Sequence, residues 1–469
     1  MRIVIGNAWP YTNGKLHLGR IVVLLPGDII ARYHRKKGDK VIFVSGSDTH
    51  GNLVLEKAHE EGLEPLEIID KYHKDFKKCF NSLDFSFDLF SNTDSKNHKE
   101  WVKDKILELY NKGYIYEDCT DNDKNLMFRL SSLNDEVESI FKNGEYWREN
   151  AKKITEKYIS EGLRDKSVTK DITFGVDVPL DGYEDKKIFV WIEALMGYLT
   201  ATQECIDDKE ETLEDYFNSE DSRVYLVHGK DNIPFHSIIF TGILSALGYK
   251  NVKLRIFSSN HLKLEGKNFS TIKNWALWIN DVLEKYSVDL IRYYLITNSP
   301  EKSDSDFRFK NFINANNYEL VEILERFYIN TISLYKKGKC NIYKNKYEKD
   351  KIINYYEEIG KKIERGELKS ALKNIISLVK EFNEERNYSI IKLINIANLL
   401  EPFMPTFSEK IKKLFEIKES GWNFIHVENI PDKLEYIETF KTLDKNLANE
   451  EIRLLKIKKN KVKNLEYLQ

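Results

Sequence analysis

The stretch AWPYTNGKLHLGR, residues 8–20, decides the fold expected for this chain. It follows a short apolar run at residues 3–5 and precedes a segment with helical apolar periodicity at residues 21–31, so the order is strand, turn and helix. His17 and Gly19 fall where the turn becomes the helix. Free backbone N–H groups and the positive end of the helix dipole favour a phosphate group at such a place. The alternative is an ordinary turn of an α/β protein without a ligand.

Composition and length limit the classes of protein. A chain of 469 residues is long enough for two or three domains. The net charge is only -2, so any site for a polyanion must be a local patch. The four cysteines are scattered without a CxxC pair, which argues against a thiolate zinc knuckle and against a disulfide framework. No apolar run could cross a bilayer and no secretory pattern is present, so we expect a soluble cytoplasmic protein that makes no membrane contact.

Two further segments repeat the design of a strand followed by polar residues. KVIFVSGSDTHG, residues 40–51, ends in Asp48 and His50, and RVYLVHGKDNIPFH, residues 223–236, leads into an apolar helix. In an open parallel sheet such strand ends meet at one edge, where ligands bind. For Asp48 the alternative is a helix cap. KIFVWIEALMGY, residues 187–198, is interpreted as sheet-like as well, and the pattern favours one nucleotide-binding sheet made of two halves.

The rest of the chain divides by composition. Residues 1–115 and 174–262 are the expected sheet halves, and residues 116–173 form a charged insertion with an amphipathic segment at 147–163. Residues 263–310 contain a polar loop with lysines and hydroxyls that suits a polyphosphate or is simply solvated. Residues 311–469 have helical periodicity and end in a basic tail. That tail is suited to nucleic acid, although such runs usually form a solvated helix face.

Five blocks of the sequence together resemble the methionyl-tRNA synthetase family of class I aminoacyl-tRNA synthetases. They are, in the order of the family, AWPYTNGKLHLG, VSGSDTHG, FVWIEALMGY, HGKDNIPFH and EGKNFSTIKNWALW. The resemblance covers residues 1–340 closely and the helical remainder more loosely. It implies an α/β fold, in which a Rossmann-type parallel-sheet catalytic domain with a trimmed insertion is followed by an all-α helical bundle. It also implies an aminoacyl-tRNA ligase.

The resemblance implies a reaction in two steps. Methionine is joined to the α-phosphate of ATP, with Mg²⁺ as cofactor and release of pyrophosphate, and the methionyl group then passes to the 3′ end of tRNA. Such chemistry depends mainly on positioning and charge stabilisation. By resemblance, the residues with catalytic roles are His17, Arg20, Lys267 and Lys273. Those that bind ATP are His17, Gly19, Gly229, Asp231, Ser270 and Thr271.

A pocket for the amino acid is implied in the same way. Asp48 would offer a carboxylate to the α-ammonium group, an interaction that is strongest where water is excluded. Trp191 and Tyr198 would offer aromatic rings to a thioether, a contact worth about 0.3–1.5 kcal/mol. The alternative for these aromatic residues is plain core packing. The implied set is Ala8, Trp9, Tyr11, Asp48, Trp191, Ala194, Tyr198, Asn232 and His236.

The sequence departs from the family pattern at both signatures. Arg20 stands where the first signature has its second histidine, and the second signature has Asn268 and Ile272 in place of its leading lysine and last serine. Lys267 and Lys273 flank that second signature. The family's zinc-binding cysteine knuckles are absent between residues 119 and 124, so no zinc or other structural metal is expected.

The helical part also differs from the family. The family reads the anticodon with an Asn and an Arg one helical turn apart, where this chain has Arg326 and Asn330, and with a Trp after a Pro, a pair that the C-terminal part lacks. LEPFMP, residues 400–405, still resembles the family's bundle. The expected partners are methionine or a related amino acid and tRNA, and the expected state is a monomer. Two alternatives stay open, a paralogue that adenylates an amino acid for a non-standard acceptor and a degenerate synthetase that binds a ligand or RNA as a regulator.

Overall fold

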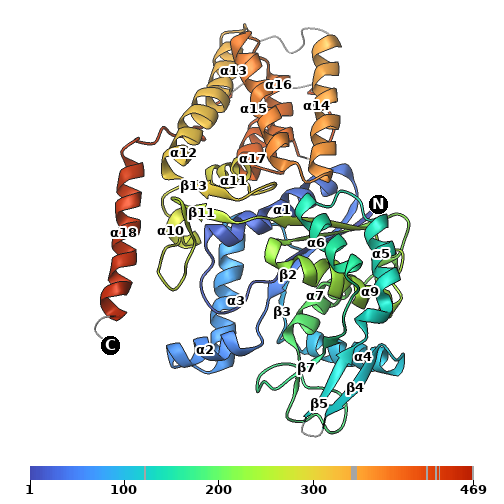
Figure 1. The fold of residues 1–469 in the computed structure, drawn as a ribbon. Helices are drawn as coiled ribbons and strands as arrows, with labels where there is room; N and C mark the ends of the chain where they lie inside the picture. The colour runs from blue at the N-terminus through green and yellow to red at the C-terminus, as the bar shows by residue number, and fades with distance from the viewer. Residues whose placement is uncertain (121–122, 340–345, 419–420, 428–429, 432–433, 467–469) are drawn as a thin grey trace. The chain divides into compact units, whose positions relative to one another are not determined.

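The structure is a computed structural model that describes residues 1–469 except 121–122, 340–345, 419–420, 428–429, 432–433 and 467–469 (Figure 1). Its contacts divide the chain into two compact units. Unit 1 contains residues 1–16, 39–81 and 85–259, and unit 2 contains residues 17–38, 82–84 and 260–469. The helix α1 (Leu18–Lys37) therefore belongs by its contacts to the C-terminal unit, although it follows the first strand in the sequence.

Unit 1 is built on a five-stranded parallel sheet with the strand order β10-β9-β1-β2-β3, which confirms the expected parallel sheet. The chain proceeds from β1 to β2 and β3 on one side, and from β9 to β10 on the other. The order therefore reverses between β1 and β9, and ligands bind at such a switch point beyond the carboxyl ends of the strands. The strands are β1 (Arg2–Asn7), β2 (Lys40–Ser47), β3 (Leu89–Asn92), β9 (Ser222–Gly229) and β10 (Leu254–Ser259).

Helices cover this sheet within unit 1. α7 (Val190–Ile206) packs on β2 and β3, and α8 (Leu213–Phe217) packs on β1 and β9. The sheet-like interpretation of residues 187–198 was wrong beyond Ile188, because α7 is buried on nearly all sides and such an apolar run looks like a buried strand. The other helices are α2 (Asn52–Glu61), α3 (Pro65–Ser82), α4 (Lys96–Asn111), α9 (Thr241–Leu247) and the short helical turns η1 (Leu130–Leu133), η2 (Lys230–Asn232) and η3 (Phe235–Phe240).

The insertion contains both helices and short strands. Its amphipathic segment forms α6 (Glu149–Ser160), whose buried residues Ala151, Thr155 and Ile159 recur every fourth position and face the core of unit 1. α5 and α6 pack on β10. The remaining elements are α5 (Asn134–Asn143), an antiparallel sheet of β4 (Ile115–Thr120), β5 (Asp123–Phe128) and β6 (Lys166–Ser167), and the pair β7 (Thr169–Lys170) and β8 (Lys187–Ile188).

Unit 2 is mainly helical, as expected, and carries a small sheet with the order β12-β11-β13. Figure 1 shows α13, α14, α15 and α16 as a bundle. No described helix is long and apolar enough to cross a membrane. The strands are β11 (Leu262–Leu264), β12 (Lys267–Asn268) and β13 (Ser305–Phe307). The helices are α10 (Ile279–Leu283), α11 (Val288–Thr297), α12 (Phe309–Asn314), η4 (Ala315–Glu325), α13 (Arg326–Lys336), α14 (Lys346–Glu364), α15 (Leu368–Glu384), α16 (Ile390–Leu400), α17 (Pro405–Leu414) and α18 (Leu447–Glu466).

A buried arginine fixes α1 within unit 2. The guanidinium of Arg292, on α11, donates to the Asp28 carboxylate on α1 at 2.6 Å. It also donates to the backbone carbonyls of Leu83 and Phe403, both at 2.9 Å. A buried charge is tolerated when its donors are satisfied in this way. These bonds connect α1, which begins directly after His17, through Arg292 to the turn after α3 and to the loop between α16 and α17.

Candidate active site

The carboxyl ends of β1, β2 and β9 enclose a cavity of about 90 Å³ in unit 1. Ala8, Trp9 and Tyr11 follow β1, Asp48 follows β2, and the residues after β9 close the other side. The nine residues expected to form an amino-acid pocket all line this one cavity. They are Ala8, Trp9, Tyr11, Asp48, Trp191, Ala194, Tyr198, Asn232 and His236.

The aromatic walls of this cavity depend on glycines beside them. A Cβ atom on Gly46 would lie 2.5 Å from the ring of Trp9, and one on Gly197 would lie 2.9 Å from the same ring. Likewise a Cβ atom on Gly6 would lie 2.6 Å from the ring of Tyr198. Glycine at these three positions therefore lets two large rings settle directly on the backbone of β1, β2 and α7.

Asp48 supplies the ionisable carboxyl group of the cavity. Its backbone N–H donates to the carbonyl of Pro10 at 2.9 Å, and its carbonyl accepts from the N–H of Thr12 at 3.0 Å, so the turn after β1 is fixed to the end of β2. The side chain is buried, and its Oδ1 atom meets no hydrogen-bond donor in the part of the chain that the structure describes. Burial raises the pKa of Asp48 well above its usual value, and the charge of Glu193 raises it further. A cation bound at Oδ1 would favour the ionised carboxylate.

At the opposite end of the cavity, the hydrogen-bond donors of Tyr198 and His236 are both already used within the protein. The Nδ1 atom of His236 lies 2.9 Å from the carbonyl of Asn232, so this nitrogen carries the proton and donates it. The Nε2 atom then accepts from the hydroxyl of Tyr198 at 2.8 Å. Burial lowers the pKa of His236 to about 4, which keeps the imidazole neutral. The two side chains satisfy each other and present a largely apolar surface.

Unit 2 holds the second candidate region, at the first turn of α1. His17 is the residue directly before α1, and the N–H of Leu18 donates to the carbonyl of Leu277 at 3.0 Å. The ring of Phe269, from the loop after β12, stacks on the imidazole of His17 with the ring centroids 5.0 Å apart. Burial, assisted by the charge of Arg20, lowers the pKa of His17 to about 3. His17 is therefore a neutral imidazole in contact with the loop that the sequence assigned to the phosphates.

The polar loop of unit 2 presents its tip to solvent. Ser270 and Trp275 exchange backbone hydrogen bonds of 3.0 and 2.9 Å, which close the loop around Thr271, Ile272 and Lys273. These three residues are exposed, Ile272 by 80%. Lys267 is exposed as well, and its ammonium lies over the ring of Trp275 at 4.9 Å. The cations and hydroxyls expected at the phosphates thus belong to one tight loop beside His17.

The other residues expected to bind ATP or its phosphates lie close to the same helix start or in unit 1. A Cβ atom on Gly19 would lie 3.0 Å from the imidazole of His17, so a larger residue would crowd that ring. Burial lowers the pKa of Arg20. Gly229 ends β9 in unit 1, and a Cβ atom there would meet nothing within 4 Å, so the space above it is open. Asp231, in η2, is exposed.

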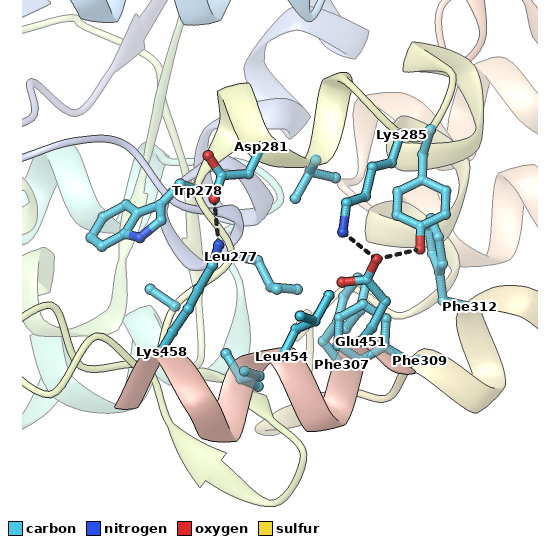
Figure 2. A pocket seen from close by; sticks show the side chains of 14 residues that line it. Leu277, Trp278, Asp281, Lys285, Phe307, Phe309, Phe312, Glu451, Leu454 and Lys458 are labelled. Atoms are coloured by element: carbon cyan, nitrogen blue, oxygen red, sulfur yellow. Dashed lines mark hydrogen bonds and ion pairs between the residues drawn. The ribbon is translucent and has the colours of Figure 1, made fainter. Parts of the chain in front are cut away.

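The C-terminal helix α18 packs beside this loop. Figure 2 shows Lys458 directed to Asp281 on α10 and Lys285 directed to Glu451. The N–O distance of each ion pair is 2.6 Å. Lys459 lies over the ring of Trp275 at 5.5 Å. Part of the basic tail therefore makes contacts within unit 2, while the side chain of Lys458 stays 45% exposed to solvent.

The residues expected at the anticodon lie on one turn of α13. Arg326 is exposed, and the side-chain amide of Asn330 donates to the hydroxyl of Tyr388 at 3.0 Å. Tyr388 was not recognised in the sequence, where only the absence of a Pro-Trp pair was noted. Its signal is an aromatic residue shortly after the end of α15, and it brings a ring to Asn330.

The described residues give no sign of a metal site built from protein ligands alone. Within the described residues, no group of three or more His, Cys, Asp or Glu side chains is arranged to hold a metal ion. A Mg²⁺ ion that arrives with ATP does not need such a group, because it is bound largely by phosphates and water. The donor set is therefore compatible with magnesium bound together with the nucleotide.

Sequence reasoning missed several residues of the cavity in unit 1. Val190, Leu195 and Phe235 also line it, and they were hidden within apolar runs that look like core. A buried group of His50, His98 and Glu193 lies behind Asp48. In the sequence, this group is indicated by Glu193 within the apolar run 187–198, since a buried carboxylate requires a hydrogen-bond or ion-pair partner.

Comparisons with known proteins identify relatives of this chain. The family model described as "tRNA synthetases class I (M)" matches residues 3–122 and 118–332. Methionine--tRNA ligase 1 of Alkaliphilus oremlandii is 37% identical, over 97% of this chain and 100% of that protein. A methionine--tRNA ligase of Bacillus cereus strain B4264 is 35% identical, over 96% of this chain and 98% of that protein. The Mycobacterium tuberculosis methionyl-tRNA synthetase bound by methionyl-adenylate has a similar fold, with a TM-score of 0.77 at 20% identity, over 88% of this chain and 94% of that chain.

Proposed function

Because the chain belongs to the class I tRNA synthetase family of the methionine type, we propose that it activates methionine with ATP and transfers it to tRNA. In the first step a carboxylate oxygen of methionine attacks the α-phosphorus of ATP, and the bond to the bridging oxygen breaks to release pyrophosphate. In the second step a hydroxyl of the terminal adenosine of tRNA attacks the methionyl carbonyl, and AMP leaves. The name carried by relatives over nearly their whole length supports this assignment.

The unpartnered Oδ1 atom of Asp48 is the observation that carries the amino-acid half of the proposal. A buried acceptor without a donor is unfavourable, and the α-ammonium group of an amino acid would satisfy it with a charge-assisted hydrogen bond. The side chain of methionine would then extend toward Tyr198 and His236. Since the hydroxyl proton of Tyr198 is already donated to His236, an apolar thioether loses nothing there, whereas a group that needs a hydrogen-bond donor would find none from this pair.

For the ATP half we propose roles according to chemistry. The neutral imidazole of His17 donates an N–H to a phosphate oxygen, and the N–H groups at the start of α1 add to it. Arg20, Lys267, Lys273, Ser270 and Thr271 stabilise the charge that develops on the leaving pyrophosphate. Gly229 and Asp231 contact the nucleoside. Mg²⁺ bound to the phosphates supplies additional charge neutralisation.

The remaining roles concern tRNA and assembly. We propose that Arg326 and Asn330 contact the anticodon within the domain of residues 311–469, and that residues 1–115 and 174–262 make the catalytic sheet, 116–173 its insertion and 263–310 the phosphate loop. We further propose a cytoplasmic monomer without bound zinc.

An amino-acid panel in the ATP–pyrophosphate exchange assay tests the proposal. We expect exchange with methionine and at least about tenfold less with leucine, isoleucine and norleucine at equal concentration, since about 1–3 kcal/mol separates close analogues in an apolar pocket. Charging of total tRNA with methionine should follow. Exchange without charging would instead identify an enzyme with a different acceptor, and the absence of exchange with every amino acid would leave a ligand-binding regulator.

A further inference from the structure

A buried carboxylate between two histidines lies directly behind the cavity of unit 1. Glu193, on α7, is 0% exposed. One oxygen lies 2.8 Å from Nδ1 of His50, in the loop after β2, and the other lies 2.9 Å from Nε2 of His98, on α4. Three elements therefore meet at one carboxylate. The proposed chemistry above does not use any of these three side chains.

The outer atoms of both rings are engaged as well. Nε2 of His50 lies 3.3 Å from the carboxylate of Asp94, which also forms an ion pair with Lys99 at 2.9 Å. Nδ1 of His98 lies 3.0 Å from the hydroxyl of Thr200. Because all four ring nitrogens have partners, neither histidine can turn without breaking a buried hydrogen bond. The cluster is thus a rigid part of unit 1.

The charges within the cluster follow from these contacts. Burial alone would lower the pKa of His50, but Glu193 and Asp94 raise it to about 10. Burial opposes ionisation of Glu193, yet the two histidines hold its pKa below its usual value. At neutral pH the pair is therefore an imidazolium next to a carboxylate. Such a pair is costly to bury unless its hydrogen bonds are complete, as they are here.

Asp48 lies two residues before His50 on the same loop. Burial and the charge of Glu193 raise the pKa of Asp48. The charge and the backbone N–H of His50 lower it, and so does the hydrogen bond from the hydroxyl of Tyr11. His50 thus offsets the glutamate charge behind Asp48. The loop is also constrained after His50, because Gly51 has a φ of 94°, which strains any residue with a side chain.

We propose that His50 and Glu193 are a positioning pair, which balances the charge behind Asp48 and fixes its loop to α7 so that Asp48 receives the ammonium group of the amino acid. This inference rests on the proposed function, since it needs Asp48 to be the ammonium site. α7 also carries Trp191, Ala194 and Tyr198 of the cavity wall. One buried pair therefore ties the charged end of the cavity to its apolar wall.

The variant His50→Asn tests the charge of His50 separately from its role in holding the loop in place. The asparagine amide can still donate to Glu193 where Nδ1 did, so the loop keeps its anchor, but the positive charge is lost. At pH 7 we expect the KM for methionine in the exchange assay to rise at least about tenfold, with the KM for ATP within twofold. The KM for methionine should fall again as the pH rises, because Asp48 then ionises without the imidazolium.

The double variant His50→Asn, Glu193→Gln removes both charges and is expected to bring the KM for methionine back to within about threefold of the unaltered protein. His98→Gln is the matched control. It changes the other histidine on the same carboxylate, keeps a donor to it, and should leave the KM for methionine within twofold. A purely structural role would instead make both single variants alike and would give no rescue.

Two inhibitors complete the test. Methioninol carries the ammonium group, and 4-(methylthio)butan-1-ol is the same chain without it. His50→Asn should weaken inhibition by methioninol about tenfold and leave that by the other alcohol unchanged. An unchanged KM for methionine in His50→Asn, or equal weakening of both inhibitors, would overturn the positioning role. Failure of the proposed function is distinct, because the unaltered protein would then show no exchange with methionine.

Discussion

The ring of Phe269 stacks on the imidazole of His17, with the planes 12° apart and the centroids at 5.0 Å. This contact joins the residue that begins α1 to the loop that carries Lys267, Ser270 and Lys273. The two signatures, some 250 positions apart in the sequence, therefore meet in unit 2 through an aromatic pair. The pair also covers His17 and contributes to the burial that keeps its imidazole neutral.

Replacing Phe269 by leucine should lower the rate of methionine-dependent exchange about 2- to 12-fold. Aromatic stacking is worth about 0.5–1.5 kcal/mol beyond area burial, and each 1.36 kcal/mol is a factor of ten in rate. Leucine keeps most of the apolar volume, so the fold should persist. The measurement is kcat for exchange, with circular dichroism to monitor folding. A rate equal to that of the unaltered protein would mean that the stack does not position His17.

His17→Ala should lower exchange at least about tenfold, because it removes a positioned donor to a phosphate oxygen. Since the pKa of His17 is about 3, the activity of the unaltered protein should show no titration of this group between pH 6 and 8. His59→Ala is the control, because His59 is an exposed histidine on α2. Loss of activity in both variants would point to a general effect of removing a histidine.

The stability of unit 1 should fall on acidification because of His236. Its pKa is about 4 in the folded chain against about 6.5 in the unfolded chain, so between these values the unfolded chain binds the additional proton. The contribution of the neutral His236 side chain to the free energy of unfolding is fully present above pH 6.5, and it decreases by about 2 kcal/mol by pH 5. Urea unfolding at both pH values measures it. In His236→Gln the pH dependence should be smaller, and an unchanged dependence would assign it to other groups.

Tyr388→Ala should impair charging of tRNA and spare exchange. The ring of Tyr388 lies at Asn330, and stacking of a base on an aromatic ring is worth about 1–3 kcal/mol. We expect kcat/KM for tRNA to fall about 5- to 150-fold, with methionine-dependent exchange unchanged. Tyr388→Phe retains the ring and should keep most of the activity. Equal charging by the alanine variant would remove Tyr388 from anticodon reading.

A chelator that binds zinc and other transition metals but not Mg²⁺ should leave exchange unchanged when Mg²⁺ is supplied in excess. The knuckle cysteines of the family are absent from the sequence, and among the described residues no group of three or more His, Cys, Asp or Glu side chains is arranged to hold a metal ion. Treatment with 1,10-phenanthroline, followed by the exchange assay, is the measurement. Metal analysis that finds one equivalent of zinc, with loss of activity on its removal, would contradict the expectation.

Much of the arrangement could be predicted from the sequence, because strand ends and glycine turns carry strong local signals. The positions of Asp48 and His236 followed from the strands before them, and the cavity brings both together. The helix α7 could not be told from a strand, because burial on nearly all sides weakens the periodicity of apolar residues. The partners of Glu193 could not be predicted either, since His50 and His98 are 143 and 95 residues away in the sequence.

The three glycines under Trp9 and Tyr198 have a further consequence for how selectivity could change. A single methyl group added at position 197 would push on an indole it already nearly touches, and would narrow the cavity without altering any residue that lines it. Substitutions of these glycines, which lie behind the two rings in the sheet and in α7, could therefore produce variants that prefer a different amino acid. A search for altered substrate range should include positions 6, 46 and 197.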